Sequence, residues 1–202
     1  MKKAFLLVLM GFMLCAANSF ATPITFDATV SSSGSANVTI TPLVTNGNVR
    51  TEYTLISPTL GSLDAFCVEA KVARSDSQPY TLEPVPSELH RAAWVAEQYW
   101  TDLSWSYSKE DTQIAIWELA FDVTIDLNTG NFKYHSGANS VAISEILAKE
   151  FGTPTKNVWW ATTPNSQNYL VRFPVPEPAT MLLLGFGLVG LAMVGRRNFL
   201  KK

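Results

Sequence analysis

The chain has 202 residues, of which 47% are hydrophobic and 16% are charged, and its formal net charge is -2. This balance, without a basic stripe interleaved with aromatic residues, gives no electrostatic basis for binding nucleic acid. The two histidines, His90 and His135, lie far apart in the sequence with no second histidine or cysteine at ligand spacing, so neither a metal site nor histidine-based catalysis is indicated. We expect no cofactor.

Residues 1–21 have the form of a secretory signal peptide. Lys2 and Lys3 provide a basic start, residues 4–17 an apolar core, and the residues up to Ala21 the small side chains that a signal peptidase recognises. We therefore expect cleavage after Ala21 and one extracytoplasmic domain at 22–174. Lipidation at Cys15 is an alternative, although the residues before it lack the usual small side chains.

Export changes what the two cysteines mean. Cys15 leaves with the signal peptide, so the exported body keeps only Cys67. A single cysteine cannot form an internal disulfide. In an oxidising compartment it indicates intermolecular pairing, a reactive thiol or another covalent use of the sulfur.

The first half of the body favours antiparallel strands. Residues 24–72 are rich in Thr, Val and Ser, with apolar residues at alternating positions. Asn46-Gly47 predicts a hairpin turn between strands at 38–44 and 49–56. The strand that follows, at 63–70, is expected to place Leu63, Ala65 and Cys67 on one face and Phe66 and Val68 on the other.

The second half of the body favours helices. The proline-rich run 78–86 is expected to exclude both regular helix and central strand. Ser87 can cap a helix that extends to about Tyr99, and Ser108 or Asp111 can cap another that extends to about Phe121. The second of these is apolar nearly all round and is expected to be buried. We also expect a turn at 126–131, a helix at 138–151 and strands at 158–161 and 169–173.

These elements predict an α+β fold. It consists of an antiparallel β-sheet, sandwich or barrel with a helical insert, preceded by the signal peptide and followed by a C-terminal transmembrane helix.

Two further groups of side chains suggest sites only weakly. Five carboxylates could in principle supply a glycosidase pair, although helix positions favour charge on the solvent-facing side. Trp159-Trp160 could stack on a sugar, with one ring in the core and the other half-exposed. We expect a protein that is not an enzyme. The carboxylates are Glu97, Glu110, Asp111, Glu118 and Asp122.

The last 28 residues, 175–202, contain three elements in a fixed order. Pro176, Glu177 and Pro178 come first, an apolar span follows at about 179–195, and the basic end 196–202 opens with Arg196 and Arg197. This arrangement resembles the PEP-CTERM sorting signal of Gram-negative bacteria. The resemblance implies an exosortase that cuts near Pro-Glu-Pro, a temporary membrane anchor, and delivery to the envelope or extracellular matrix. The alternative is a permanent tail anchor, with the C-terminus held in the cytoplasm.

Two short segments of the body resemble the thioester domains of bacterial surface adhesins. They are Phe66-Cys67-Val68-Glu69 and Thr112-Gln113-Ile114-Ala115-Ile116-Trp117, which match an aromatic-Cys-hydrophobic-acid signature and a Thr-Gln-x-Ala-aliphatic-Trp signature. The resemblance implies a bond between Cys67 as thiol and Gln113 as acyl donor. Phe66, Glu69, Thr112, Ala115 and Trp117 would surround it.

Two hypotheses about function follow. In the first, the domain attaches covalently to an amine-bearing surface target through a Cys67–Gln113 thioester. In the second, it is a non-covalent polysaccharide-binding or structural matrix protein, with Cys67 a small core residue and Gln113 a hydrogen-bonded helix residue.

Overall fold

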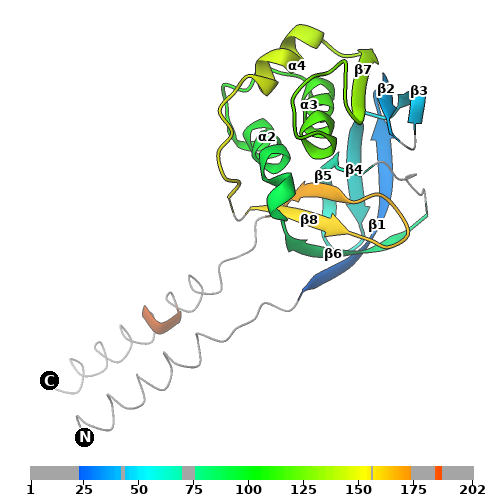
Figure 1. Cartoon of the computed structure of the whole chain (residues 1–202). Helices are drawn as coiled ribbons and strands as arrows, with labels where there is room; N and C mark the ends of the chain where they lie inside the picture. Colours follow the sequence, from blue (N-terminus) through cyan, green and yellow to red (C-terminus); the bar gives the residue numbers. More distant parts are fainter. Residues whose placement is uncertain (1–22, 42–43, 70–75, 156, 174–184, 188–202) are drawn as a thin grey trace, which may run out of the picture.

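A computed structural model describes residues 23–41, 44–69, 76–155, 157–173 and 185–187. The body is a closed six-stranded antiparallel barrel, and its helices and a second, three-stranded sheet gather at one end (Figure 1). The predicted α+β fold with a helical insert is confirmed, and the barrel is the form that its sheet takes. The barrel order is β1 (Ile24–Ser33), β4 (Glu52–Ser57), β5 (Gly61–Cys67), β9 (Tyr169–Arg172), β8 (Val158–Thr162) and β6 (Gln78–Pro84).

Strand β1 closes the barrel because it is long enough to serve two partners. Its first half, Ile24 to Ala28, pairs with β6, and its second half, Thr29 to Ser33, pairs with β4. Closure in this way gives each of the six strands a neighbouring strand on both sides over part of its length. The alternation expected from the sequence holds in β5, where Leu63, Ala65 and Cys67 are buried on one face.

The prediction that residues 78–86 exclude a central strand is wrong. Gln78 to Pro84 form β6, which pairs with β1 through Leu82 and with β8 from Thr81 onwards. Pro79 therefore lies where only β1 is a partner, and Pro84 lies where only β8 is. At each proline, the backbone position that lacks an N–H donor can face the side with no neighbouring strand, so no hydrogen bond of the barrel is lost.

The expected turn at Asn46-Gly47 is also wrong. These residues lie within β3 (Val44–Val49), where Gly47 pairs with Val38 of β2 (Ala36–Ile40). Strand β2 also pairs with β7 (Phe132–Ser136), which completes the small sheet. Pairing along β2 thus overrides the local turn preference of Asn-Gly.

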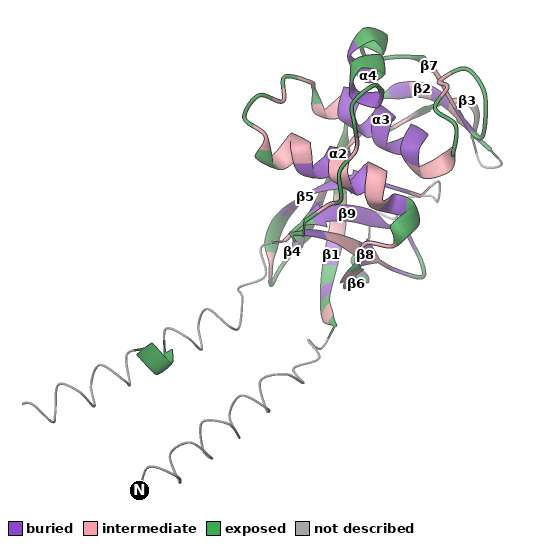
Figure 2. Cartoon of the chain, turned by 60° about the vertical axis from the view of Figure 1, so that its left-hand side comes forward, coloured by how far each residue is buried: buried purple, intermediate pink, exposed green. Residues whose placement is uncertain are grey.

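The helices cover the barrel end that β5 reaches. They are η1 (Ser87–Leu89), α2 (His90–Thr101), α3 (Lys109–Phe121) and α4 (Ser140–Leu147), the last of which is shorter than the predicted helix at 138–151. Helix α3 packs against α2, α4, β7 and the β4–β5 part of the barrel, so it is buried on nearly every side, as predicted (Figure 2). Ser108 caps it, and a reciprocal capping box joins Ser108 and Asp111.

The expected signal peptide with its cleavage after Ala21 lies outside the described residues. So does the predicted tail, except for residues 185–187. Within the described part of the chain, no helix is long and apolar enough to cross a membrane.

Candidate functional site

Helix α3 brings Gln113 to the barrel. The side chain lies in the second turn of the helix and is completely buried, like Thr112 before it and Ala115 after it. Thr112 donates its hydroxyl to the Ser108 carbonyl at 2.8 Å and lies 3.2 Å from the indole nitrogen of Trp105, which donates to it. The capped first turn therefore fixes where α3 begins and, with it, the position of the Gln113 amide.

Strand β5 presents Cys67 at the point where its neighbour β4 has already ended. Pairing between β4 and β5 extends only as far as Tyr53 opposite Ala65, whereas β9 continues alongside Cys67 through Tyr169. Val68 donates its N–H to the Asn168 carbonyl on the β9 side. Since adjacent residues direct their backbone groups to opposite edges, those of Cys67 face the side that β4 has left.

The Gln113 amide lies at the edge of β5 beside Cys67, beyond the end of β4. Its Oε1 accepts the N–H of Cys67 at 2.9 Å, and its Nε2 donates to the Cys67 carbonyl at 2.9 Å. Both residues have 0% exposure. The structure thus brings together the two residues that sequence analysis paired, through hydrogen bonds between a side-chain amide and a backbone, with Cys67 as a free thiol.

The thiol itself is in a dry environment. Cys67 Sγ donates to the Glu69 carbonyl at 3.0 Å. Burial raises the pKa of the Cys67 thiol to about 12, while the Glu69 backbone and the nearby Trp117 side chain oppose that rise. The sulfur is therefore protonated at neutral pH and reacts only if its proton is taken away during the reaction.

Three tyrosines form a buried layer in the barrel interior close to Cys67. The ring of Tyr169 lies 5.5 Å from that of Tyr53 and 6.1 Å from that of Tyr80, centroid to centroid. Burial first, and the nearby Cys67 second, raise the pKa of the Tyr53 and Tyr169 hydroxyls far above the ordinary value. This layer keeps water away from the sulfur on the barrel side.

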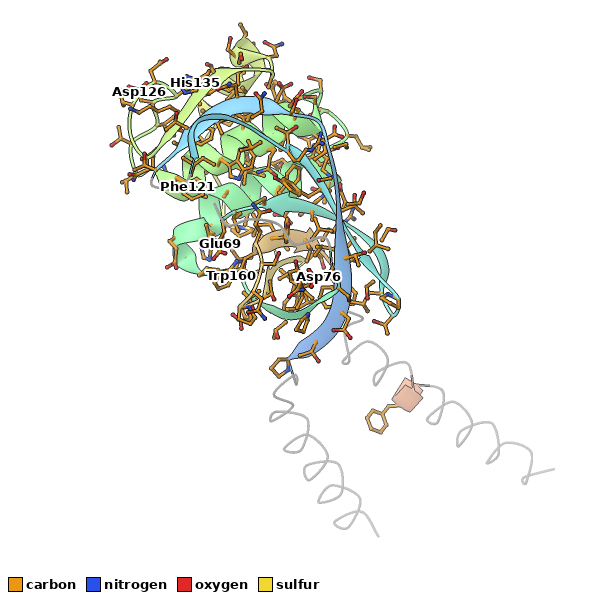
Figure 3. All side chains as sticks on the ribbon, turned by 90° about the vertical axis from the view of Figure 1, so that its right-hand side faces the viewer. Glu69, Asp76, Phe121, Asp126, His135 and Trp160 are labelled. Atoms are coloured by element: carbon orange, nitrogen blue, oxygen red, sulfur yellow. The ribbon has the colours of Figure 1, made fainter. Side chains whose placement is uncertain are left out.

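The chain after Cys67 is held by the loop between β8 and β9. Asn168 donates its Nδ2 to the Glu69 carboxylate at 2.7 Å, and its Oδ1 accepts the N–H of Thr163 at 2.8 Å. Figure 3 shows Glu69 at the level where the helices meet the barrel. The adhesin-like segments of the sequence include Glu69 but not Asn168. The one signal for Asn168 in the sequence is the polar run 165–168, directly before the buried strand β9.

Lys109 is a second residue that sequence analysis missed. It lies one helical turn before Gln113, donates its Nζ to the Tyr53 carbonyl at 2.7 Å and pairs with Asp64. The amine also lies 5.7 Å from the centroid of the Phe66 ring. Phe66, expected beside the site, packs on the outer face of the barrel against the rings of α2. Lys109 and Gln113 together fasten α3 to the β4–β5 end.

The weaker candidates do not assemble into a site. The described residues contain no group of three His, Cys, Asp or Glu placed to hold a metal ion. The expectation that helix carboxylates face solvent is wrong for Glu97, Asp111 and Glu118, which are buried because each accepts hydrogen bonds from another part of the chain. Trp159 and Trp160 are both half-buried, whereas one was expected in the core.

Comparison with known proteins identifies the C-terminal end of the chain. The PEP-CTERM protein-sorting motif matches residues 174–197, a stretch that includes Pro176, Glu177, Pro178, Arg196 and Arg197. The matched stretch does not reach the body, and no curated protein and no solved structure matches the chain significantly. The three tail elements and this match lead to one conclusion: the chain is an exported protein that exosortase sorts to the cell surface through its PEP-CTERM motif.

Proposed function

We propose that the body forms an internal thioester between Cys67 Sγ and Gln113 Cδ, and that this bond attaches the protein covalently to an amine on a surface or matrix target. The observation that carries the proposal is the pair of 2.9 Å hydrogen bonds that hold the Gln113 amide against Cys67. The chain fold supplies this proximity from residues 46 positions apart, which removes most of the entropic cost of bringing them together.

The first reaction is the formation of the bond. Cys67 Sγ attacks Gln113 Cδ, the C–N bond breaks, and the thiol proton leaves with the amide nitrogen as ammonia. The Cys67 N–H already donates to Oε1, the oxygen that becomes negative when the sulfur adds. A fixed donor at such an oxygen lowers the barrier to acyl transfer. To attack, the sulfur must exchange its hydrogen bond to the Glu69 carbonyl for the amide carbon.

The second reaction is attachment. An amine adds to the thioester carbon, the C–S bond breaks, and the products are an amide at Gln113 and a free thiol at Cys67. Until then the acyl group must be protected from water. Complete burial of both residues and the tyrosine layer beneath them support that protection.

A second candidate function is non-covalent binding to polysaccharide, or a structural role in the matrix. One observation favours it: the oxygen and the nitrogen of the Gln113 side-chain amide each have a hydrogen-bond partner without any covalent bond. A buried glutamine that replaces a missing strand at a barrel edge needs no further explanation. On this proposal the half-buried Trp159 and Trp160 are the side chains available for stacking on a sugar.

The intact mass of the protein distinguishes the thioester proposal from the non-covalent one. The exported protein, purified with its natural ends, should be lighter than its sequence by one ammonia. Cys67→Ala and Gln113→Ala should lack this deficit, and Gln98→Ala, which changes a half-buried glutamine of α2, should keep it. Methylamine should add its full mass to the ammonia-deficient protein, so that the product, an N-methylated Gln113, is one methylene group heavier than the sequence. A wild-type protein of full mass with a thiol that titrates after unfolding would disprove the thioester.

A further inference from the structure

Trp117 carries a polar group for which the proposed reactions have so far given no role. The side chain is 2% exposed, and its indole N–H has no hydrogen-bond partner of ordinary geometry among the described residues. A buried donor without a partner is uncommon, because the group loses its bond to water on folding. The position of this donor is therefore informative.

The position is next to the sulfur. Trp117 follows Gln113 by four residues on α3, so the two side chains share one face of the helix, and the Gln113 amide lies on the Cys67 backbone. On its other side the Trp117 ring packs against Phe132, with 6.1 Å between centroids. The Trp117 side chain is also one of the groups that lower the pKa of the Cys67 thiol, as a donor close to the sulfur would.

Other groups near the sulfur do not supply a donor of this kind. The charge of Glu69 raises the pKa of the Cys67 thiol. The Tyr53 hydroxyl donates to the Arg50 carbonyl at 2.6 Å, and the Tyr169 hydroxyl lies 3.0 Å from Gln167 Oε1 and donates to it. The Tyr80 hydroxyl, the third of the tyrosine layer, interacts with the Ser166 side chain. The indole N–H is thus a neutral donor that remains for a negative sulfur.

We propose that the Trp117 indole N–H donates to the Cys67 sulfur and stabilises the thiolate that leaves when an amine opens the thioester. The inference rests on the proposed function. As the C–S bond breaks, its electron pair stays on sulfur, and the proton released by the attacking amine later neutralises it. A thioester sulfur is a poor acceptor and a thiolate is a strong one, so this hydrogen bond strengthens along the reaction and lowers the barrier.

The first test is Trp117→Phe, which keeps an aromatic ring and removes the N–H. The variant should retain the ammonia deficit but react with methylamine roughly ten-fold more slowly, as expected for the loss of one hydrogen bond of ordinary strength. Trp94→Phe, whose ring packs on Phe151, should react at the wild-type rate. A Trp117→Phe protein that keeps the deficit and opens as fast as wild type would overturn the proposal.

The second test needs neither a folded Trp117→Phe variant nor an intact thioester. The indole ¹H–¹⁵N signal of Trp117, identified among six tryptophans by its contacts to Phe132, should move upfield in Cys67→Ala. In a wild-type protein that has the bond, the signal should move downfield when methylamine releases the sulfur. A signal that does not move in Cys67→Ala disproves the hydrogen bond. A wild type of full mass whose signal does move instead disproves the thioester and, with it, the leaving-group role.

Discussion

The two halves of α3 hold buried polar groups in opposite ways. Near the N-terminal end, the Gln113 amide has a partner for each of its two groups on Cys67. Near the C-terminal end, Glu118 is also fully buried, but only its Oε1 accepts a hydrogen bond, from the N–H of Asp126 at 2.7 Å, and Oε2 has no partner among the described residues. Figure 3 shows Glu69, beside the first site, well separated from Asp126, beside the second.

The difference lies in what faces each half. The N-terminal half meets a barrel edge that β4 has left, where a neutral amide matches one N–H and one carbonyl. The C-terminal half meets the turn between α3 and β7, where the Asp122 and Asp126 carboxylates are already occupied by backbone N–H groups of the turn. Burial, and then these two charges, raise the pKa of Glu118 to about 7. One helix thus carries a matched polar contact and a mismatched one.

Loss of the matched contact should have the largest effect on stability. Gln113→Ala leaves a buried N–H and a buried carbonyl of Cys67 without partners and opens a cavity, so the free energy of unfolding should fall by about 2–4 kcal/mol. Denaturant unfolding measures this, with Gln98→Ala as the control that should change little. A loss as small as that of the control would mean that water or another group replaces the amide.

Replacing the Glu118 carboxylate should raise the stability of the protein, and the size of the increase should depend on pH. The folded-state pKa of Glu118, about 7, lies above its ordinary value of 4.5, so the folded protein binds more protons between these values and stability falls as pH rises through that window. Glu118→Gln should therefore stabilise the protein by about 2 kcal/mol above pH 7 and flatten the pH dependence.

Unfolding curves at about pH 5 and about pH 8 measure the Glu118 effect. The exposed Glu145→Gln should leave the pH dependence as it is in wild type. Equal slopes for wild type and Glu118→Gln would show that Glu118 does not titrate in this range.

A smaller effect is expected from the residue that aligns the matched half. Lys109→Met keeps most of the aliphatic stem but removes the hydrogen bond to the Tyr53 carbonyl and the ion pair with Asp64, so unfolding should become easier by about 1–2 kcal/mol. Lys109→Arg should recover part of that loss by keeping the charge. If Lys109 also positions Gln113, Lys109→Met should lower the fraction of protein with the ammonia deficit, measured by mass. An unchanged fraction would limit Lys109 to stability.

Several parts of the fold follow from local patterns. Alternation placed Cys67 and Phe66 on opposite faces of β5, and the near-complete apolar surface of α3 predicted its burial, because both signals depend only on the period of the element. The hairpin at Asn46-Gly47 and the exclusion of a strand at Pro79 were wrong. In each case pairing with a strand distant in sequence decided the outcome, and a local preference carries no information about that partner.

The site shows the same division. Resemblance paired Cys67 with Gln113 from two short segments, and the structure shows them in contact. No resemblance pointed to Lys109 or Asn168, since their roles depend on Tyr53, Asp64 and Glu69, which come from other strands and turns. It also misplaced Glu97, Asp111 and Glu118 at the surface, because helix position alone does not show which turns will supply donors to a buried carboxylate.

The sequence by itself determined export and sorting, because a PEP-CTERM tail is recognised by another protein as a linear segment. With the predicted cleavage after Ala21, it leaves Cys67 as the cysteine of the body. Only the tertiary structure decided what surrounds that cysteine. The early end of β4 leaves an N–H and a carbonyl of Cys67 unpaired, and α3 fills the gap with an amide; both facts depend on where distant segments stop beside each other.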